Sequence, residues 1–352
     1  MQSNPTKYMA IGQAILAAAL FGMSAPFSKL LLVKIPPLML SALLYLGAGL
    51  GMLLIDLGKR ILGVERVEAK LAKKELPFVI LMVVLDIIAP IFLMLGLTMT
   101  TSASASLLIN FEIVATSIVA LVIFKEAIDR RLWLSIILIT LSSIILSVND
   151  FTSLSFSMGS VFVLLACISW GFENNCTRKL SLKDPLQVVI IKGLASGFGA
   201  LVIAGFASEL LWHLGYILFS LLLGFFAYGL SIFFYVNAQR HLGAARTSTY
   251  YAVAPFIGVG ISFIILSEPI TLSFVAASII MIIGTYFAVI EGHGHDHEHP
   301  VIEHAHRHNH SDGHHGHFHE TIVHGDHAHL HIHEKMVHAH PHTPDLHHAH
   351  KH

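Results

Sequence analysis

The chain has 352 residues, of which 55% are hydrophobic and only 12% are charged, whereas a soluble globular chain carries about 25% charged residues. This composition excludes an ordinary soluble enzyme and a disordered chain, and it indicates a protein that crosses a membrane several times. The formal net charge of −1 and the lack of a basic arm give no indication of a nucleic-acid partner.

Ten long apolar runs follow one another along the first 290 residues. A membrane-spanning helix needs about 20 mostly apolar residues, and we predict such helices at 9–32, 37–57, 76–97, 100–123, 131–149, 157–178, 185–208, 215–237, 243–266 and 270–290. The runs are continuously apolar rather than alternating, which is typical of helices and not of a transmembrane β-barrel. The predicted fold class is therefore an all-α integral membrane protein with ten transmembrane helices.

Basic residues fall in every second connection between these helices, with Lys34 as the exception on the other side. They are Lys59, Arg60, Arg66, Lys70, Lys73, Lys74, Lys125, Arg130, Arg131, Arg178, Lys179, Lys183, Arg240 and Arg246. Cytoplasmic loops are enriched in lysine and arginine. We therefore expect both termini to lie in the cytoplasm and the protein to reside in the cell membrane.

The two halves of this helical body resemble each other. Recurring features at spacings of 149, 148 and 142 residues are Phe21-Gly22 with Trp170-Gly171, Pro37 with Pro185, and Glu126 with Glu268. Each half has five spans, and an odd number inserts the second half upside down, a common plan of secondary transporters. We therefore predict two inverted five-helix repeats, at 1–149 and 150–290, followed by a histidine-rich tail at 291–352.

With these features the chain resembles the EamA-type carriers of the drug/metabolite transporter superfamily over about residues 9–290. The resemblance rests on the aromatic-Gly pairs and on two helices that end in Glu126-Ala127-Ile128 and Glu268-Pro269-Ile270. The second half adds Gly243-Ala244-Ala245 and Ala254-Pro255-Phe256, which are similar to family elements. The first half has Glu112-Ile113 where the family usually has a proline. The resemblance implies a ten-helix carrier, often an exporter of metabolites or amino acids.

Several polar residues lie inside predicted spans, where an ionisable group costs at least about 2.5 kcal/mol on insertion. The residues that we expect to line a cavity for substrate or a coupling proton are Asp86, Asn110, Glu112, Glu173, Asn174 and Lys192. The acids would bind a cationic group of the substrate or carry the proton. Glu173 and Lys192 lie on neighbouring helices, so we expect an ion pair between them. The alternative is that these groups only bond helices to one another.

Prolines and tyrosines offer weaker signals in the same segments. Pro26, Pro90 and Pro255 interrupt predicted helices, which frees carbonyls for a solute, permits a bend, or leaves a static kink. Four tyrosines face either a cavity or the membrane interface, and they are Tyr228, Tyr235, Tyr250 and Tyr251.

The tail holds 24 of the 26 histidines in its 62 residues, arranged largely as His-x-His among acidic residues. Neutral imidazole suits Zn, Cu, Ni and Co. Candidate metal ligands are His293, His295, His297, His299, His304, His306, His308, His310, His327, His329, His331 and His333. Such a polar segment should have no ordered structure without metal. A tail whose charge changes with pH is the alternative.

Three functions fit this sequence. The first is a gradient-driven carrier, an exporter of a small metabolite or amino acid, with a regulatory metal-binding tail. The second is a transporter of a divalent transition metal such as Zn, Ni or Co, whose tail collects or senses the ion. The third is a membrane anchor for a metal store. No catalytic or nucleotide-binding motif is present, so we expect no enzyme and no required cofactor. The expected partners are the solute, the bilayer and, in a homodimer, a second copy.

Overall fold

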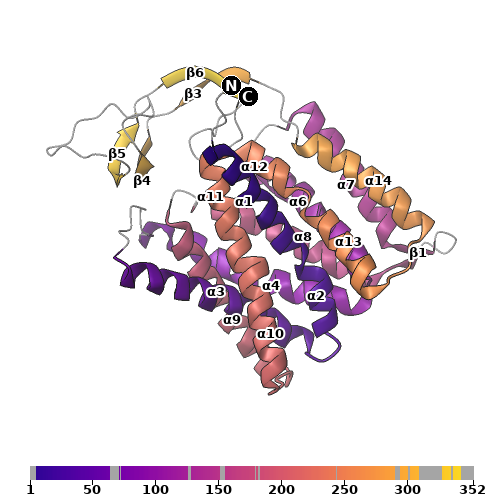
Figure 1. Ribbon diagram of the computed structural model, residues 1–352. Helices are drawn as coiled ribbons and strands as arrows, with labels where there is room; N and C mark the ends of the chain where they lie inside the picture. The colour runs from indigo at the N-terminus through magenta and orange to yellow at the C-terminus, as the bar shows by residue number, and fades with distance from the viewer. Residues whose placement is uncertain are drawn as a thin grey trace.

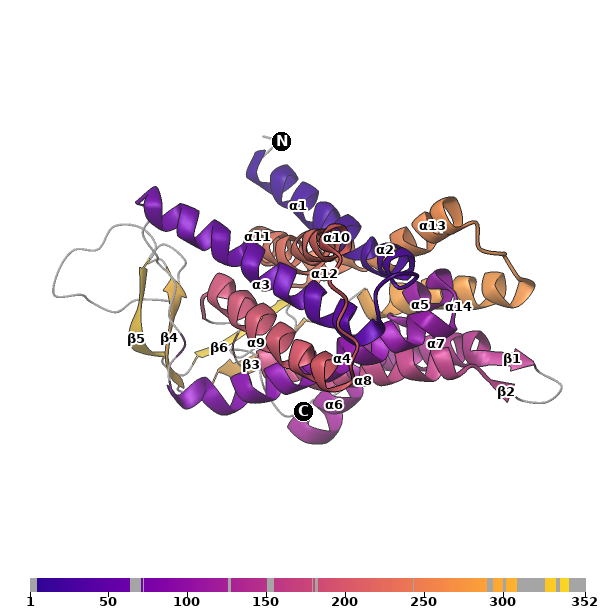
Figure 2. The same cartoon turned by 90° about the horizontal axis from the view of Figure 1, so that it is seen from below.

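A helical body runs from Pro5 to Val289 in the computed structural model (Figures 1 and 2). The structure describes residues 5–63, 71, 73–125, 128–150, 155–178, 180, 183–242, 244–289, 294–299, 302–308, 327–333 and 336–341. Its helices are α1 (Pro5–Gly22), α2 (Ser24–Leu31), α3 (Pro37–Ile61), the 3₁₀ turn η1 (Lys73–Glu75), α4 (Leu76–Met99), α5 (Ser102–Leu108), α6 (Phe111–Phe124), α7 (Arg130–Ser147), α8 (Met158–Arg178), α9 (Pro185–Phe206), α10 (Leu214–Gly224), the π-helical segment η2 (Phe225–Leu230), α11 (Ser231–Leu242), α12 (Ala244–Tyr251), α13 (Ala254–Leu266) and α14 (Leu272–Val289).

Within the described residues, eight helical segments are long and apolar enough to cross a membrane. Two more occupy the remaining predicted places. Helix α8 has 21 residues, but Glu173 and the two asparagines that follow it make its second half more polar. Helix α13 is a shorter apolar helix that continues α12. The prediction of an all-α membrane protein is therefore confirmed.

Three of the spans are broken near their middle. Helix α1 gives way to α2 at Met23, and α12 gives way to α13 at Ala252 and Val253. In both cases a proline, Pro26 or Pro255, stands in the first turn of the second helix, where its missing N–H is tolerated. The span of α5 and α6 breaks without a proline. There, the amide Nδ2 of Asn110 donates to the carbonyl of Leu107 at 3.1 Å and competes with the helical ladder.

The helices of each half pack mainly on helices of the other half. Helix α3 packs on α9 and α4 packs on α8, while α1 packs on α11. Helices α7 and α14 lie side by side in both Figure 1 and Figure 2. In the first half the third span (α4) packs on the first span of the second half (α8). In the second half the third span (α11) packs in the same way on the first span of the first half (α1). The bundle is therefore one body made by two interlocked sets of helices.

Glycines allow the closest of these crossings. A Cβ atom added at Gly49 of α3 would lie 2.5 Å from the backbone nitrogen of Leu194 in α9. One added at Gly197 of α9 would lie 2.6 Å from the backbone nitrogen of Leu46 in α3. Helices α3 and α9 thus touch backbone to backbone, as is common between membrane helices that carry small residues.

Large apolar side chains cover the outside of the bundle. Phe206, Ile264 and Leu272 are each more than four-fifths exposed, at 89%, 82% and 87%. Exposed apolar patches of this kind are rare on soluble monomers. Here they form the surface that contacts lipid.

Polar side chains hold together the end of the bundle whose connections carry few basic residues. The carboxylate of Glu268 accepts hydrogen bonds from the backbone N–H groups of Ser102 (2.7 Å) and Ala103 (2.8 Å), at the start of α5. Glu209 accepts one from the N–H of Leu38 at 3.0 Å, at the start of α3. Lys29 donates to the carbonyl of Thr100 at 2.8 Å, at the end of α4. Glu126, the counterpart of Glu268, lies outside the described residues.

Short strands lie outside the helical bundle. Strands β1 (Val148–Asp150) and β2 (Ser155–Phe156) form a hairpin between α7 and α8. In the tail, β3 (Gly294–His299) pairs with β6 (Met336–Pro341), and β4 (Ile302–His308) pairs with β5 (His327–His333), all antiparallel. The sequence predicts no ordered structure in the tail, whereas these four segments of it are paired strands. The His-x-His alternation has the period of two residues that suits a strand.

Candidate functional site

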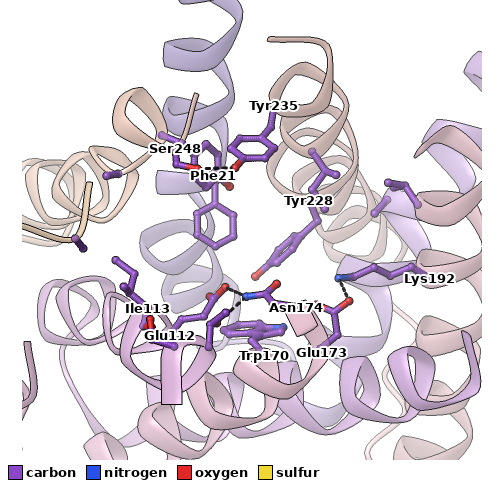
Figure 3. Close-up of a pocket in the computed structure, with 18 of the residues that line it drawn as sticks. Phe21, Glu112, Ile113, Trp170, Glu173, Asn174, Lys192, Tyr228, Tyr235 and Ser248 are labelled. Carbon is purple, nitrogen blue, oxygen red and sulfur yellow. Dashed lines mark hydrogen bonds and ion pairs between the residues drawn. The ribbon is translucent and has the colours of Figure 1, made fainter. Parts of the chain in front are cut away.

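A cavity of about 630 Å³ opens inside the bundle, lined by residues from both halves (Figure 3). Four of the six residues predicted from the sequence line it: Glu112, Glu173, Asn174 and Lys192. Glu112 lies in the first turn of α6, just after the helix break. Glu173 and Asn174 come from α8, and Lys192 comes from α9. The halves therefore both contribute charged groups to one space.

Lys192 lies between two carboxylates. Its Nζ atom is 3.1 Å from Oδ2 of Asp86 and 3.1 Å from Oε1 of Glu173. The side chain of Asp86 is fully buried behind the cavity wall, and that of Glu173 is 2% exposed. The predicted pair of Glu173 with Lys192 is therefore present, and it is extended into a triad that ties α4, α8 and α9 together. Thr177 also donates to Glu173 through its hydroxyl.

Two aromatic residues support Asp86 from the other side. The hydroxyl of Tyr45 donates to Oδ1 of Asp86 at 3.0 Å, and Nε1 of Trp170 donates to that hydroxyl at 3.5 Å. Both side chains are buried and line the cavity. Sequence reasoning missed Tyr45. It stands one helical turn before Gly49, so it lies on the face of α3 that meets α9, and this spacing was the available signal.

Glu112 has a neutral partner. The amide Nδ2 of Asn174 donates to Oε1 of Glu112 at 2.6 Å and to the hydroxyl of Thr116 at 3.3 Å. Gly171 permits this contact, because a Cβ atom there would lie 2.6 Å from Cβ of Ala115 on α6. The close approach of α8 to α6 sets Asn174 beside Glu112. Within the described residues, the structure gives Glu112 no basic partner.

Asn110 was predicted to line a cavity, but it is not among the described residues that line this one. Its Oδ1 accepts from the hydroxyl of Thr285 at 3.4 Å, and its Nδ2 donates to the carbonyl of Leu107. It is buried at the break between α5 and α6. Asn110 therefore holds the broken span against α14, which was the alternative interpretation of these amides.

Aromatic rings form much of the remaining wall. Three of the four predicted tyrosines, Tyr228, Tyr235 and Tyr251, line the cavity together with Phe21, whereas Tyr250 packs between α1 and α11. The ring of Phe21 meets that of Tyr228 edge-on, with centroids 6.0 Å apart. In Figure 3 the hydroxyl of Tyr228 points toward Asn174, and it makes no hydrogen bond within the described residues.

Known proteins resemble this chain over the whole helical body. The family model of the EamA-like transporters matches residues 8–148 and, a second time, residues 157–290. The chain belongs to the EamA-like transporter family. It is also 27% identical over 290 residues to a protein of Methanothermobacter thermautotrophicus described as an uncharacterized transporter, a match that covers 77% of this chain and 83% of the relative. The protein is therefore a membrane transporter.

A solved crystal structure shares the fold of this EamA-like transporter. It superposes with a TM-score of 0.57 at 14% sequence identity, covering 80% of this chain and 95% of the other. At that identity the likeness shows the fold alone. The two family matches divide the EamA-like body between α7 and α8. The cavity lies where these two matched segments meet, since α6 belongs to the first and α8 and α9 belong to the second.

The cavity of this EamA-like transporter reaches one end of the bundle. Its lining includes Leu132, which directly follows Arg130 and Arg131, and Val289, the last residue of α14. The other end is the one held by Glu268 and Glu209. A cavity that reaches one end, with hydrogen-bonded connections at the other, is suited to receiving a solute from one side of the membrane.

Proposed function

We propose that this transporter carries a small organic metabolite or amino acid, driven by an ion gradient and working as an exporter across the cell membrane. The observation that supports this most is the charged cavity between the halves, in which Glu112 faces the triad of Asp86, Lys192 and Glu173. Buried charges are costly in a membrane, so by default they mark a solute or ion path. Secondary transporters bind their substrates at this place, between repeats and beside broken helices.

The segments 1–149 and 150–290 would be the two inverted repeats, rocking against each other around the cavity. The end with Leu132 and Val289 carries the basic connections, so by the positive-inside rule it faces the cytoplasm. Both termini would then be cytoplasmic, and the structure would represent the state that loads an exported solute.

Replacing Glu112 or Glu173 with glutamine should reduce transport at least 10-fold while leaving the protein folded. Each change removes one charge from the cavity and keeps the shape of the side chain. The measurement is counterflow of labelled metabolites in vesicles reconstituted with the full-length chain. Asp129→Asn is the matched control, because Asp129 caps α7, is not among the described residues that line the cavity, and asparagine caps a helix equally well. Normal counterflow in both glutamine variants would contradict the cavity assignment.

Transition-metal transport by the body has less support. Among the described residues that line the cavity, none is a histidine or cysteine, the ligands that zinc and copper favour. We propose instead that metal binds to the tail. In the β4–β5 pair the register sets histidines opposite one another, as His304 with His331, His306 with His329, and His308 with His327. His293 and His310 lie outside the described residues.

Ending the chain after Ile290 should abolish most binding of Zn, Ni, Co and Cu without unfolding the body. Metal bound to purified protein is measured by mass spectrometry, and the melting temperature reports the fold. The full-length Glu112→Gln variant is the control, and it should bind as much metal as the wild type. If metal binding instead follows residue 112 and survives the truncation, the body itself takes metal.

A further inference from the structure

The charges in the cavity wall and directly behind it do not balance. Three carboxylates, those of Glu112 and Glu173 in the lining and that of Asp86 behind it, stand against one ammonium, that of Lys192, which leaves a formal charge of −2. No other lysine or arginine is among the described lining residues. The cavity is therefore electrostatically suited to a positively charged occupant.

Lys192 is not available to a ligand. Its Nζ atom is shared between Asp86 and Glu173, at 3.1 Å from each. A substrate carboxylate would have to displace one of these buried acids, and the displaced acid would lose its partner. An anion, or the carboxylate of a zwitterion, thus finds no free cation in the described part of this site.

Glu112, by contrast, keeps room for a ligand. Asn174 occupies its Oε1, and no ion pair of Glu112 occurs among the described residues. The buried hydroxyl of Tyr228 points toward the same place and makes no hydrogen bond within the described chain (Figure 3). A substrate ammonium beside Glu112 would gain a charge-assisted hydrogen bond.

The rings around Glu112 favour an organic ion over a bare one. Phe21 lies 5.8 Å from Tyr251, and Tyr251 lies 4.9 Å from Tyr235, measured between ring centroids. Aromatic faces attract ammonium groups and also pack against apolar groups. The volume of about 630 Å³ falls in the range of sites for small molecules.

We propose that the cavity binds an organic cation that has no free carboxylate, with its ammonium beside Glu112 and its apolar part among Phe21, Tyr228 and Tyr251. This rests on the proposed transport function and narrows its substrate class. Amines and quaternary ammonium compounds fit the site, whereas common zwitterionic amino acids do not.

Three probes of similar size but different charge test this proposal. They are 2-phenylethyltrimethylammonium (a fixed cation), phenylalanine (a zwitterion) and 3-phenylpropionate (an anion). Binding to the full-length protein in detergent is measured by calorimetry. We expect the cation to bind at least 10-fold more tightly than phenylalanine, and we expect no saturable binding of the anion. Glu112→Gln should weaken binding of the cation at least 10-fold, and Asp129→Asn should leave it unchanged.

Equal or tighter binding of phenylalanine, or no saturable binding of the cation, would overturn the proposal. Vesicle counterflow, measured with a mixture of labelled amino acids and with the labelled cation, separates this failure from failure of the transport function. If counterflow depends on Glu112 while the cation does not bind, the transport function stands and the cation assignment falls. If neither amino acids nor cations move, the transport function fails as well.

Discussion

A chain in which methionine replaces Lys192 should lose transport and unfold at a much lower temperature than the wild type. Lys192 is the shared partner of Asp86 and Glu173, whose side chains are at most 2% exposed. Removing one member of a buried ion pair costs about 3–5 kcal/mol, because the remaining charge is left without compensation. The melting temperature in detergent and counterflow in vesicles measure the two effects.

Removing all three charges of the triad together separates their effect on stability from their effect on transport. The triple variant Asp86→Asn, Lys192→Met and Glu173→Gln removes all three charges together, so no buried ion lacks a partner. We expect it to recover most of the melting temperature that the single Lys192→Met change loses, while transport remains absent. A Lys192→Met chain that melts like the wild type would show that the triad does not hold α4, α8 and α9 together.

Valine at position 49 should prevent the two halves from assembling. A Cβ atom at Gly49 would lie 2.5 Å from a backbone atom of α9, and backbone cannot move aside as a flexible side chain can. Overpacking a tight interior costs about 1–3 kcal/mol or more, and Gly193 and Gly197 of α9 approach the backbone of α3 just as closely. The expected result is aggregated protein in size-exclusion chromatography after detergent extraction.

Gly58→Val is the matched control for this substitution. Gly58 lies in the same helix, and nothing lies within 4 Å of a Cβ atom added there. This variant should elute and melt like the wild type, since valine is no worse a helix former than glycine. If both valine variants behave alike, close contact between α3 and α9 is not what joins the halves.

The spans were predictable because each depends on local apolar length. Even so, the place of Asn110 outside the cavity lining could not be predicted from the sequence, for a physical reason. A polar residue inside a span must find a partner, but the sequence does not say whether that partner is a solute, a side chain or a carbonyl. Asn110 binds the carbonyl of Leu107, one turn earlier in its own broken span, whereas Asn174 of α8 binds Glu112 of the neighbouring α6 in the cavity wall. That difference depends on helix rotation, which packing of the whole bundle sets.

The triad of Asp86, Lys192 and Glu173 also could be predicted only in part from the sequence. Glu173 and Lys192 stand on consecutive spans, so their pairing could be anticipated from the sequence. Asp86 joins them from the first half through the packing of α4 on α8 and α9. Nothing local to Asp86 indicates this contact. Tyr45 likewise reaches Asp86 only through the packing of α3 on α4.

The packing of each half on the other has a consequence for synthesis of the chain. Gly49 and Gly193, which meet at the α3–α9 crossing, are 144 residues apart in the sequence. A ribosome adds about 5–20 residues per second, so α3 waits roughly 7–30 seconds for its partner. During that time Asp86 has no Lys192 beside it. The nascent first half therefore exposes a carboxylate and a glycine-lined face within the bilayer, and insertion factors must shield both until α9 arrives.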